Sequence, residues 1–143
     1  MLCAAVFLGA LSAQAGDAAW GDNFEAAVEK AKEENKPILM DFTGSDWCGW
    51  CVRLDKEVFS QSAFKDYAAD NLVLMEIDFP RDKILTDKVK EQNNALKRKY
   101  GIRGYPTLIL LSPDEKILWK GGYMPGGPDA MIAELKKHIP AKS

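Results

Sequence analysis

The chain has 143 residues, of which 47% are hydrophobic and 28% charged, and this size is typical of a single globular domain. Its formal net charge is −2 and its pI is about 5.5, with Lys and Arg scattered among Asp and Glu. Because the sequence has no basic stripe that could neutralise phosphates, the composition argues against a nucleic-acid partner and against binding to an anionic membrane surface.

Residues 1–15 differ from the rest of the chain, because they carry no charged side chain and end in Ala-Gln-Ala at positions 13–15. This pattern is typical of the apolar core and cleavage site of a secretory signal peptide, and the run is too short to span a bilayer. A buried N-terminal strand or helix is the alternative. We therefore expect a signal peptide over residues 1–15, which includes Cys3, followed by one domain over residues 16–143.

The mature part begins with a predicted helix and a predicted strand. Asp22 and Glu25 have the spacing of a capping box, which predicts a helix that starts at Asp22 as N-cap and is stopped by Pro37. The apolar run over residues 38–43 predicts a buried strand.

A second helical stretch follows a turn at residues 44–46. It opens at Cys48, continues through residue 58, and can be extended to residue 67 by a serine cap at position 60 or 62. The nearly continuous apolar run over residues 72–78 then predicts a second buried strand.

The remaining elements are a long helix, a hairpin and a final helix. Residues 80–99 are polar with apolar residues at helical spacing, and Gly101 fits a helix C-cap. A turn separates the predicted strands 107–111 and 116–120, which therefore run antiparallel. Pro128 starts the last helix. Strands that alternate with helices in this order predict an α/β fold with a mixed sheet covered by helices on both faces.

The sequence Trp-Cys-Gly-Trp-Cys at positions 47–51 lies where a strand ends and a helix begins. The partial positive charge and free N–H groups of a helix start stabilise a thiolate, so the pKa of Cys48 should fall below that of a free cysteine. Cys51, one helical turn deeper, lies within reach of a disulfide to Cys48. The spacing predicts that Cys48 attacks a disulfide and Cys51 resolves the mixed disulfide.

The two cysteines have three other possible interpretations. A zinc site needs four ligands, and His138 is the only histidine, so such a site would have to be shared between two chains. A structural disulfide across two residues closes too short a loop to stabilise much. A Cys–His hydrolase would need His138, which serves the end of the last helix instead.

Two segments resemble the thioredoxin family. Leu-Met-Asp-Phe at 39–42, followed by the motif at 47–51, is similar to the family's first strand and redox motif. Lys-Tyr-Gly-Ile-Arg-Gly-Tyr-Pro-Thr at 99–107 is similar to the segment that carries the family's cis-proline. The resemblance covers about residues 22–140. It implies a thioredoxin fold, with a central mixed four-stranded sheet flanked by helices.

The chain also departs from thioredoxin. Trp50 stands where thioredoxin has a proline, one extra residue separates Asp41 from Cys48, and the segment 80–95 is longer. The stretches 44–47 and 54–59 resemble exported thioredoxin-like proteins, such as the C-terminal domain of the transmembrane disulfide reductase. This likeness implies a periplasmic or otherwise exported protein.

The resemblance also suggests site residues outside the cysteine pair. It implies a cis bond at Pro106, pairing of Tyr105 with the substrate backbone, and a small residue at Gly122 beside the site. It further implies that Asp41 helps to deprotonate Cys51. The alternatives are a loop aromatic at Tyr105, a turn glycine at Gly122 and a locally hydrogen-bonded strand-edge carboxylate at Asp41.

The sequence also suggests a substrate contact for one aromatic residue. Trp50 lies beside the thiols, where an exposed ring could rest on a substrate peptide. Taken together, these residues predict a monomeric thiol–disulfide oxidoreductase that reduces or isomerises protein disulfides, without a bound cofactor or metal. An upstream thiol donor, for which a membrane disulfide reductase is one candidate, would keep it reduced. A thioredoxin-fold binding or chaperone module with little redox turnover is the alternative.

Overall fold

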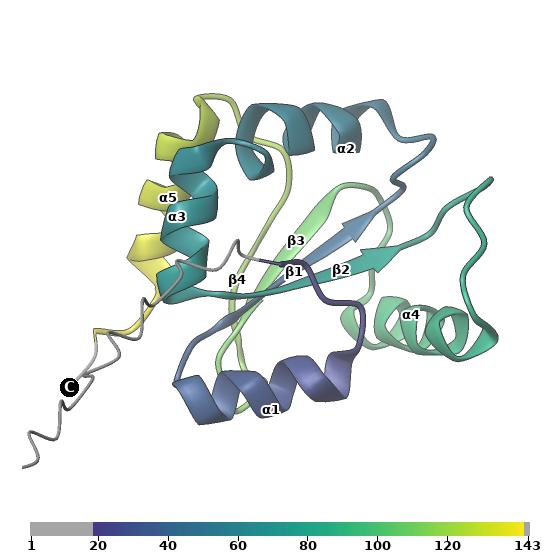
Figure 1. The fold of residues 1–143 in the computed structure, drawn as a ribbon, viewed down its shortest axis with the longest axis horizontal. Helices are drawn as coiled ribbons and strands as arrows, with labels where there is room; N and C mark the ends of the chain where they lie inside the picture. The colour runs from purple at the N-terminus through teal and green to yellow at the C-terminus, as the bar shows by residue number, and fades with distance from the viewer. Residues whose placement is uncertain (1–18, 142–143) are drawn as a thin grey trace, which may run out of the picture.

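A computed structural model describes residues 19–141, so the predicted signal peptide and Cys3 lie outside the described residues. Within this range no helix is long and apolar enough to cross a membrane. The elements, traced in Figure 1, are α1 (Phe24–Glu34), β1 (Ile38–Thr43), α2 (Gly49–Leu54), the π-helix η1 (Asp55–Phe59), α3 (Ser62–Asn71), β2 (Val73–Asp78), α4 (Asp87–Tyr100), β3 (Thr107–Leu111), β4 (Ile117–Gly121) and α5 (Gly127–His138).

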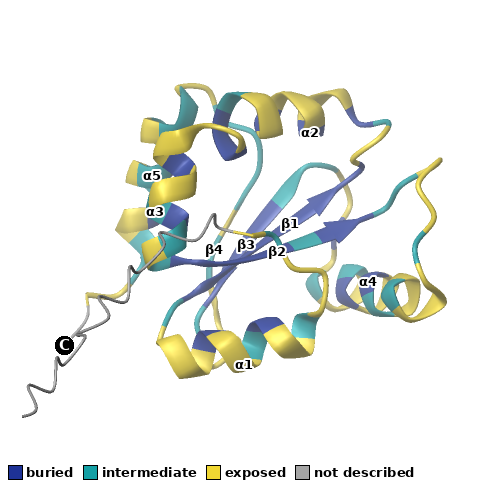
Figure 2. Ribbon diagram, viewed as in Figure 1, coloured by how far each residue is buried: buried dark blue, intermediate teal, exposed yellow. Residues whose placement is uncertain are grey.

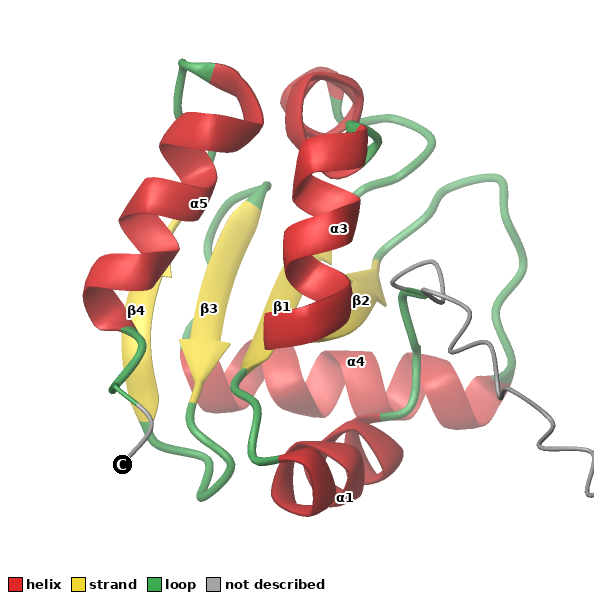
Figure 3. Ribbon diagram, turned by 60° about the vertical axis from the view of Figure 1, so that its left-hand side comes forward, coloured by secondary structure: helices red, strands yellow, loops and turns green. Residues whose placement is uncertain are grey.

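The four strands form one mixed sheet in the order β2-β1-β3-β4. β1 pairs in parallel with β2 and antiparallel with β3, and β4 completes an antiparallel hairpin with β3. Helices α1 and α4 cover one face of this sheet, and α3 and α5 cover the other (Figures 1 and 3). The predicted α/β fold, with a central mixed four-stranded sheet flanked by helices, is confirmed.

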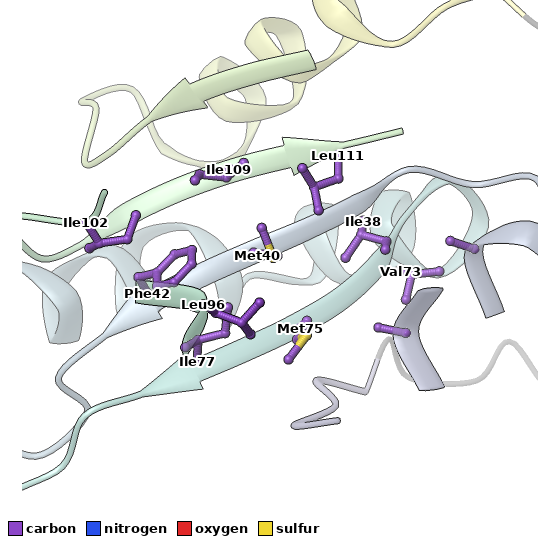
Figure 4. Packing of buried hydrophobic residues seen from close by; sticks show 12 residues of the cluster. Ile38, Met40, Phe42, Val73, Met75, Ile77, Leu96, Ile102, Ile109 and Leu111 are labelled. Carbon is purple, nitrogen blue, oxygen red and sulfur yellow. The ribbon is translucent and has the colours of Figure 1, made fainter. Parts of the chain in front are cut away.

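Alternate residues of β1, β2 and β3 belong to separate cores, as the period of two in a strand requires. One core lies on the α1 and α4 face of the sheet (Figure 4); its members from β1, β2 and β3 are Ile38, Met40, Phe42, Val73, Met75, Ile77, Ile109 and Leu111. The opposite core contains the intervening positions Leu39, Leu74, Leu108 and Leu110 together with residues of α2, η1, α3 and α5. Figure 2 shows the result: β1, β2 and β3 are mostly buried, whereas the outer faces of the helices are exposed.

This alternation decides where the polar residues of the strands point. Asp41 follows Leu39 by two positions, and Glu76 follows Leu74 by two, so both carboxylates face the layer that contains α2. The two residues are also cross-strand partners in the β1–β2 register. The sheet therefore carries two carboxylates on the side of the cysteine helix.

Two predicted element boundaries were wrong. Asn23, not Asp22, is the N-cap of α1, because its Oδ1 accepts a hydrogen bond from the Ala26 backbone N–H at 2.9 Å. The helix predicted over 80–99 begins only at Asp87, where Thr86 is the N-cap. Residues 81–83 instead donate three backbone N–H groups to the carboxylate of Asp46, which holds this segment as a loop beside the turn at 44–46.

Smaller differences concern the middle helices and the strand ends. The stretch after Cys48 is α-helical only to Leu54 and continues as a π-helix to Phe59. Neither serine caps α3: its N-cap is Gln61, without a side-chain cap, and its end extends from 67 to 71. The second and fourth strands each begin one residue later than predicted. Gly101, with a φ of 63°, is the C-cap of α4, as predicted.

Candidate active site

Cys48 and Cys51 are joined by a disulfide at the start of α2, with their Cα atoms 5.2 Å apart. Cys48 is the N-cap of the helix, and its Sγ accepts a hydrogen bond from the Cys51 backbone N–H at 3.2 Å. Cys51 is predicted to lie deeper than Cys48, but the difference is small: Cys48 is 7% exposed and Cys51 is 5% exposed in this disulfide form. The position at the helix start, rather than burial, therefore distinguishes Cys48 as the sulfur that the helix N–H groups can stabilise as a thiolate.

The indole of Trp47 fixes the segment that leads into Cys48. Its Nε1 donates a hydrogen bond to the Phe79 carbonyl at 2.7 Å, and its ring meets the ring of Tyr105 edge-on at 5.7 Å between centroids. The Arg81 guanidinium lies 4.4 Å above the same indole. A side chain at Gly44 would collide with this ring, so the turn needs a glycine there. Trp47 thus packs the cysteine loop against the loop that contains Tyr105.

Tyr105 and Pro106 are joined by a cis peptide bond just before β3. The Tyr105 ring packs against the rings of Trp47 and Phe79, so it contacts other side chains of the protein. Gly122 lies directly against this segment, since a Cβ added there would be 3.0 Å from the Pro106 carbonyl oxygen. The structure therefore brings together Pro106, Tyr105 and Gly122 from segments that the sequence separates.

Asp41 and Cys51 line the same cleft, which has a volume of about 270 Å³; its other lining residues are Thr43, Ser45, Val52, Asp55 and Glu76. Asp41 is only 9% exposed, and its Oδ1 has no hydrogen-bond partner. Its pKa is raised from 3.8 to about 8, mainly by burial and then by the nearby charges of Glu76, Asp55 and Asp78 in that order. Asp41 therefore holds a proton near neutral pH in a cleft that reaches the second cysteine.

The comparison with known families bears directly on this arrangement. A sequence profile of the thioredoxin-like domain matches residues 24–139, which is most of the chain. The chain belongs to the thioredoxin-like family.

Members of this family include close relatives of the chain. Disulfide bond reductase DsbH of Chlamydia pneumoniae is 34% identical over 118 residues, which cover 82% of this chain and 71% of DsbH. Thioredoxin-related protein DsbJ of the same organism is 33% identical over 120 residues, but these cover only 34% of DsbJ. A solved structure of a DsbH oxidoreductase has a TM-score of 0.81 at 32% identity, and the match covers 86% of this chain and 85% of that one.

Two acidic residues of this thioredoxin-like site were missed by the sequence analysis. Asp55 follows Cys51 by four positions, so a helical turn places it on the same side as the second cysteine. Glu76 interrupts the apolar run of β2, and its pKa is raised, first by burial and then by Asp78. A charged residue within an otherwise apolar strand was the signal that could have identified Glu76.

No metal-binding cluster is formed within residues 19–141, because His, Cys, Asp and Glu nowhere gather in threes in an arrangement that could hold an ion. His138 lies on α5, where its Nε2 is 3.2 Å from Glu134 Oε1. A shared zinc site would thus require ligands from a second chain.

Proposed function

We propose that this thiol–disulfide oxidoreductase reduces protein disulfides outside the cytoplasm. The observation that carries the proposal is the Cys48–Cys51 disulfide at the start of a helix, on a fold shared with disulfide reductase relatives. The signal-like composition of residues 1–15 supports an exported location. The alternative of a binding or chaperone module rests on the same fold but gives the cysteine pair no role.

The reaction needs no cofactor, because the two thiols carry both electrons. The Cys48 thiolate attacks one sulfur of the substrate disulfide, so a mixed disulfide forms and the other substrate sulfur leaves as a thiolate that takes up a proton. Asp41 is mostly protonated at pH 7, and its ionised fraction accepts the proton of the Cys51 thiol through the shared cleft. The Cys51 thiolate then attacks Cys48 Sγ. The Cys48–Cys51 disulfide forms, and the second substrate sulfur leaves and is protonated.

The oxidised pair must be reduced again by a dithiol donor. The cleft that Cys51 lines also contains Asp55 and Glu76, and negative charge on these side chains disfavours a thiolate at the second cysteine. Because the thiolate form is not strongly stabilised, the disulfide form is favoured and the pair acts as a reductant. A membrane disulfide reductase is the class of donor that fits an exported location.

Turnover of insulin distinguishes the reductase from a binding module. We expect the protein to accelerate dithiothreitol-driven reduction of insulin, followed by the precipitation of the released B chain. The doubly substituted Cys48→Ser/Cys51→Ser protein is the matched control, because serine is close to cysteine in size and preserves the fold but removes the redox pair. Equal rates with both proteins, combined with suppression of aggregation of an unfolded client by both, would identify the chaperone alternative instead.

A methyl group at Gly122 should narrow the space beside the Pro106 carbonyl. Because the added Cβ would be 3.0 Å from a backbone oxygen that cannot rotate away, Gly122→Ala should lower kcat/KM for insulin by about tenfold. Gly104→Ala is the control, since a Cβ there meets no atom within 4 Å. If both variants reduce insulin as fast as the wild type, Gly122 is a turn residue without a role in substrate binding.

A further inference from the structure

Four side chains next to the cysteine pair form a connected cluster, which we call the aromatic shelf: Trp50, Arg53, Glu57 and Tyr123. The rings of Trp50 and Tyr123 lie 5.0 Å apart between centroids. The Arg53 guanidinium lies 5.2 Å from both ring centroids. The shelf therefore joins the helix that carries the cysteines to the loop that follows β4.

Glu57 binds the two other polar groups of the shelf. One carboxylate oxygen lies 2.6 Å from Arg53 Nε, and the other accepts a hydrogen bond from the Tyr123 hydroxyl at 2.5 Å. These hydrogen bonds lower the pKa of Glu57, so it stays ionised and neutralises Arg53. The shelf consequently has no net charge, and it exposes the Trp50 ring together with the paired Arg53.

The shelf borders the place where a substrate must approach the reactive sulfurs. Trp50 stands between Cys48 and Cys51 in the sequence. Tyr123 directly follows Gly122, where an added Cβ would be 3.0 Å from the Pro106 carbonyl oxygen. Trp50 is also 55% exposed, although tryptophan side chains are highly buried on average. If the cluster only braced the helix against the loop, burial of this ring would be the more stable arrangement.

We propose that the aromatic shelf binds an aromatic side chain of the substrate that lies next to the reacting cysteine. The proposal rests on the reductase function above and adds a substrate preference to it. Trp50 and Tyr123 make the contact through ring stacking, and the guanidinium of Arg53 offers a second planar surface. Glu57 is a positioning residue, because it holds Arg53 and Tyr123 in place without reaching the substrate itself.

Two peptides test this preference directly. Each is closed by one intramolecular disulfide, and they are identical except for Phe or Ala next to one cysteine. The rate constants for their reduction by the reduced protein are each divided by the rate constant for dithiothreitol, which corrects for intrinsic reactivity. We expect the corrected Phe/Ala ratio to be about fivefold for the wild type.

Substitutions locate the preference on the shelf. Tyr123→Leu should bring the Phe/Ala ratio to about one, and Glu57→Gln should lower it by about half, because Arg53 and Tyr123 lose their anchor. Tyr67→Leu is the matched control. Tyr67 packs against the core on the α3 and α5 face, and the ammonium group of Lys136 lies 5.5 Å from its ring centroid. Tyr67→Leu should keep the wild-type ratio. Trp50→Ala changes an exposed position and provides a second test if Tyr123→Leu does not fold.

The outcomes separate the two proposals. A Phe/Ala ratio of one in the wild type, or a ratio that neither Tyr123→Leu nor Trp50→Ala changes, overturns the shelf as a binding surface but leaves the reductase in place. Failure of the reduced wild type to reduce either peptide overturns the reductase function itself. A peptide with Glu in place of Phe should show no advantage over Ala, and a clear advantage would show that Arg53 selects acidic substrates instead.

Discussion

Replacement of Cys48 by serine should lower the rate of disulfide exchange by at least about a thousandfold, because the hydroxyl cannot replace the attacking thiolate. Replacement of Cys51 should have a different consequence. In Cys51→Ser the first attack still occurs, but no second thiol releases the substrate, so a mixed disulfide on Cys48 should accumulate. The mass of the intact protein after mixing with insulin measures both results.

Alkylation of the reduced wild type provides the control for this assignment. Below pH 7, iodoacetamide should label Cys48 first, since its sulfur is stabilised by the helix N–H groups. Cys51 lies in the acidic cleft and should react later. Preferential labelling of Cys51, or trapping of substrate on Cys48→Ser rather than on Cys51→Ser, would reverse the two roles.

Asp41→Asn should stabilise the oxidised protein at neutral pH, which is an unusual effect for a buried substitution. The folded protein holds a proton on Asp41 up to pH of about 8, whereas the unfolded chain releases it near 3.8. Between these values the unfolded state binds fewer protons, so wild-type stability falls by up to about 1.4 kcal/mol per pH unit as pH rises. Asp41→Asn has no carboxyl group at this position, so its free energy of unfolding does not fall for this reason.

The expected gain in unfolding free energy is about 3–4 kcal/mol at pH 7 and close to zero at pH 4, which corresponds to a Tm higher by about 10 °C at pH 7. Thermal unfolding of the two oxidised proteins across this pH range measures it. Asp46→Asn is a control of opposite sign, because hydrogen bonds from the backbone N–H groups of residues 81–83 lower the pKa of Asp46. That variant should be less stable than the wild type at pH 7, and the difference should fade below about pH 4.

The Asp41→Asn variant also tests the proton transfer to Asp41. If Asp41 accepts the Cys51 proton, Asp41→Asn should slow release of the mixed disulfide by about tenfold or more, while the first attack by Cys48 keeps its rate. Rapid quenching of single-turnover reactions separates the two steps. Equal slowing of both steps would point to a disturbed active-site structure, and an unchanged second step would remove Asp41 from the mechanism.

The fold was predictable from the sequence because its main signals are local. Apolar runs of strand length, helical spacing and turn residues recur in an order that only a mixed sheet with helices on both faces accommodates. Cys48 and Cys51 could be predicted for the same reason, since a strand, a turn and a helix start are contiguous around them. The start of α4 was mispredicted because Asp46, which is distant in sequence, binds residues 81–83 as a loop.

The less predictable parts of the site depend on strand register and helix geometry. Glu76 faces Asp41 only because β1 and β2 pair in one particular register. Tyr123 reaches Glu57 across 66 positions of sequence, through the placement of β4 beside the layer that contains α2. No periodicity within a single segment indicates either contact, so the Asp41–Glu76 and Glu57–Tyr123 pairs emerge only from the assembled structure.

The reduction potential of the Cys48–Cys51 pair tests most directly whether the protein works as a reductase. Gly49 and Trp50 bring no charge between the cysteines, and the nearby carboxylates oppose a thiolate, so the reduced form is not strongly favoured. Equilibration of the wild type with reduced and oxidised glutathione, followed by trapping and counting of free thiols, should give a potential on the order of −200 to −270 mV. A potential above about −150 mV would place the protein among the disulfide-forming oxidants and contradict the proposed function.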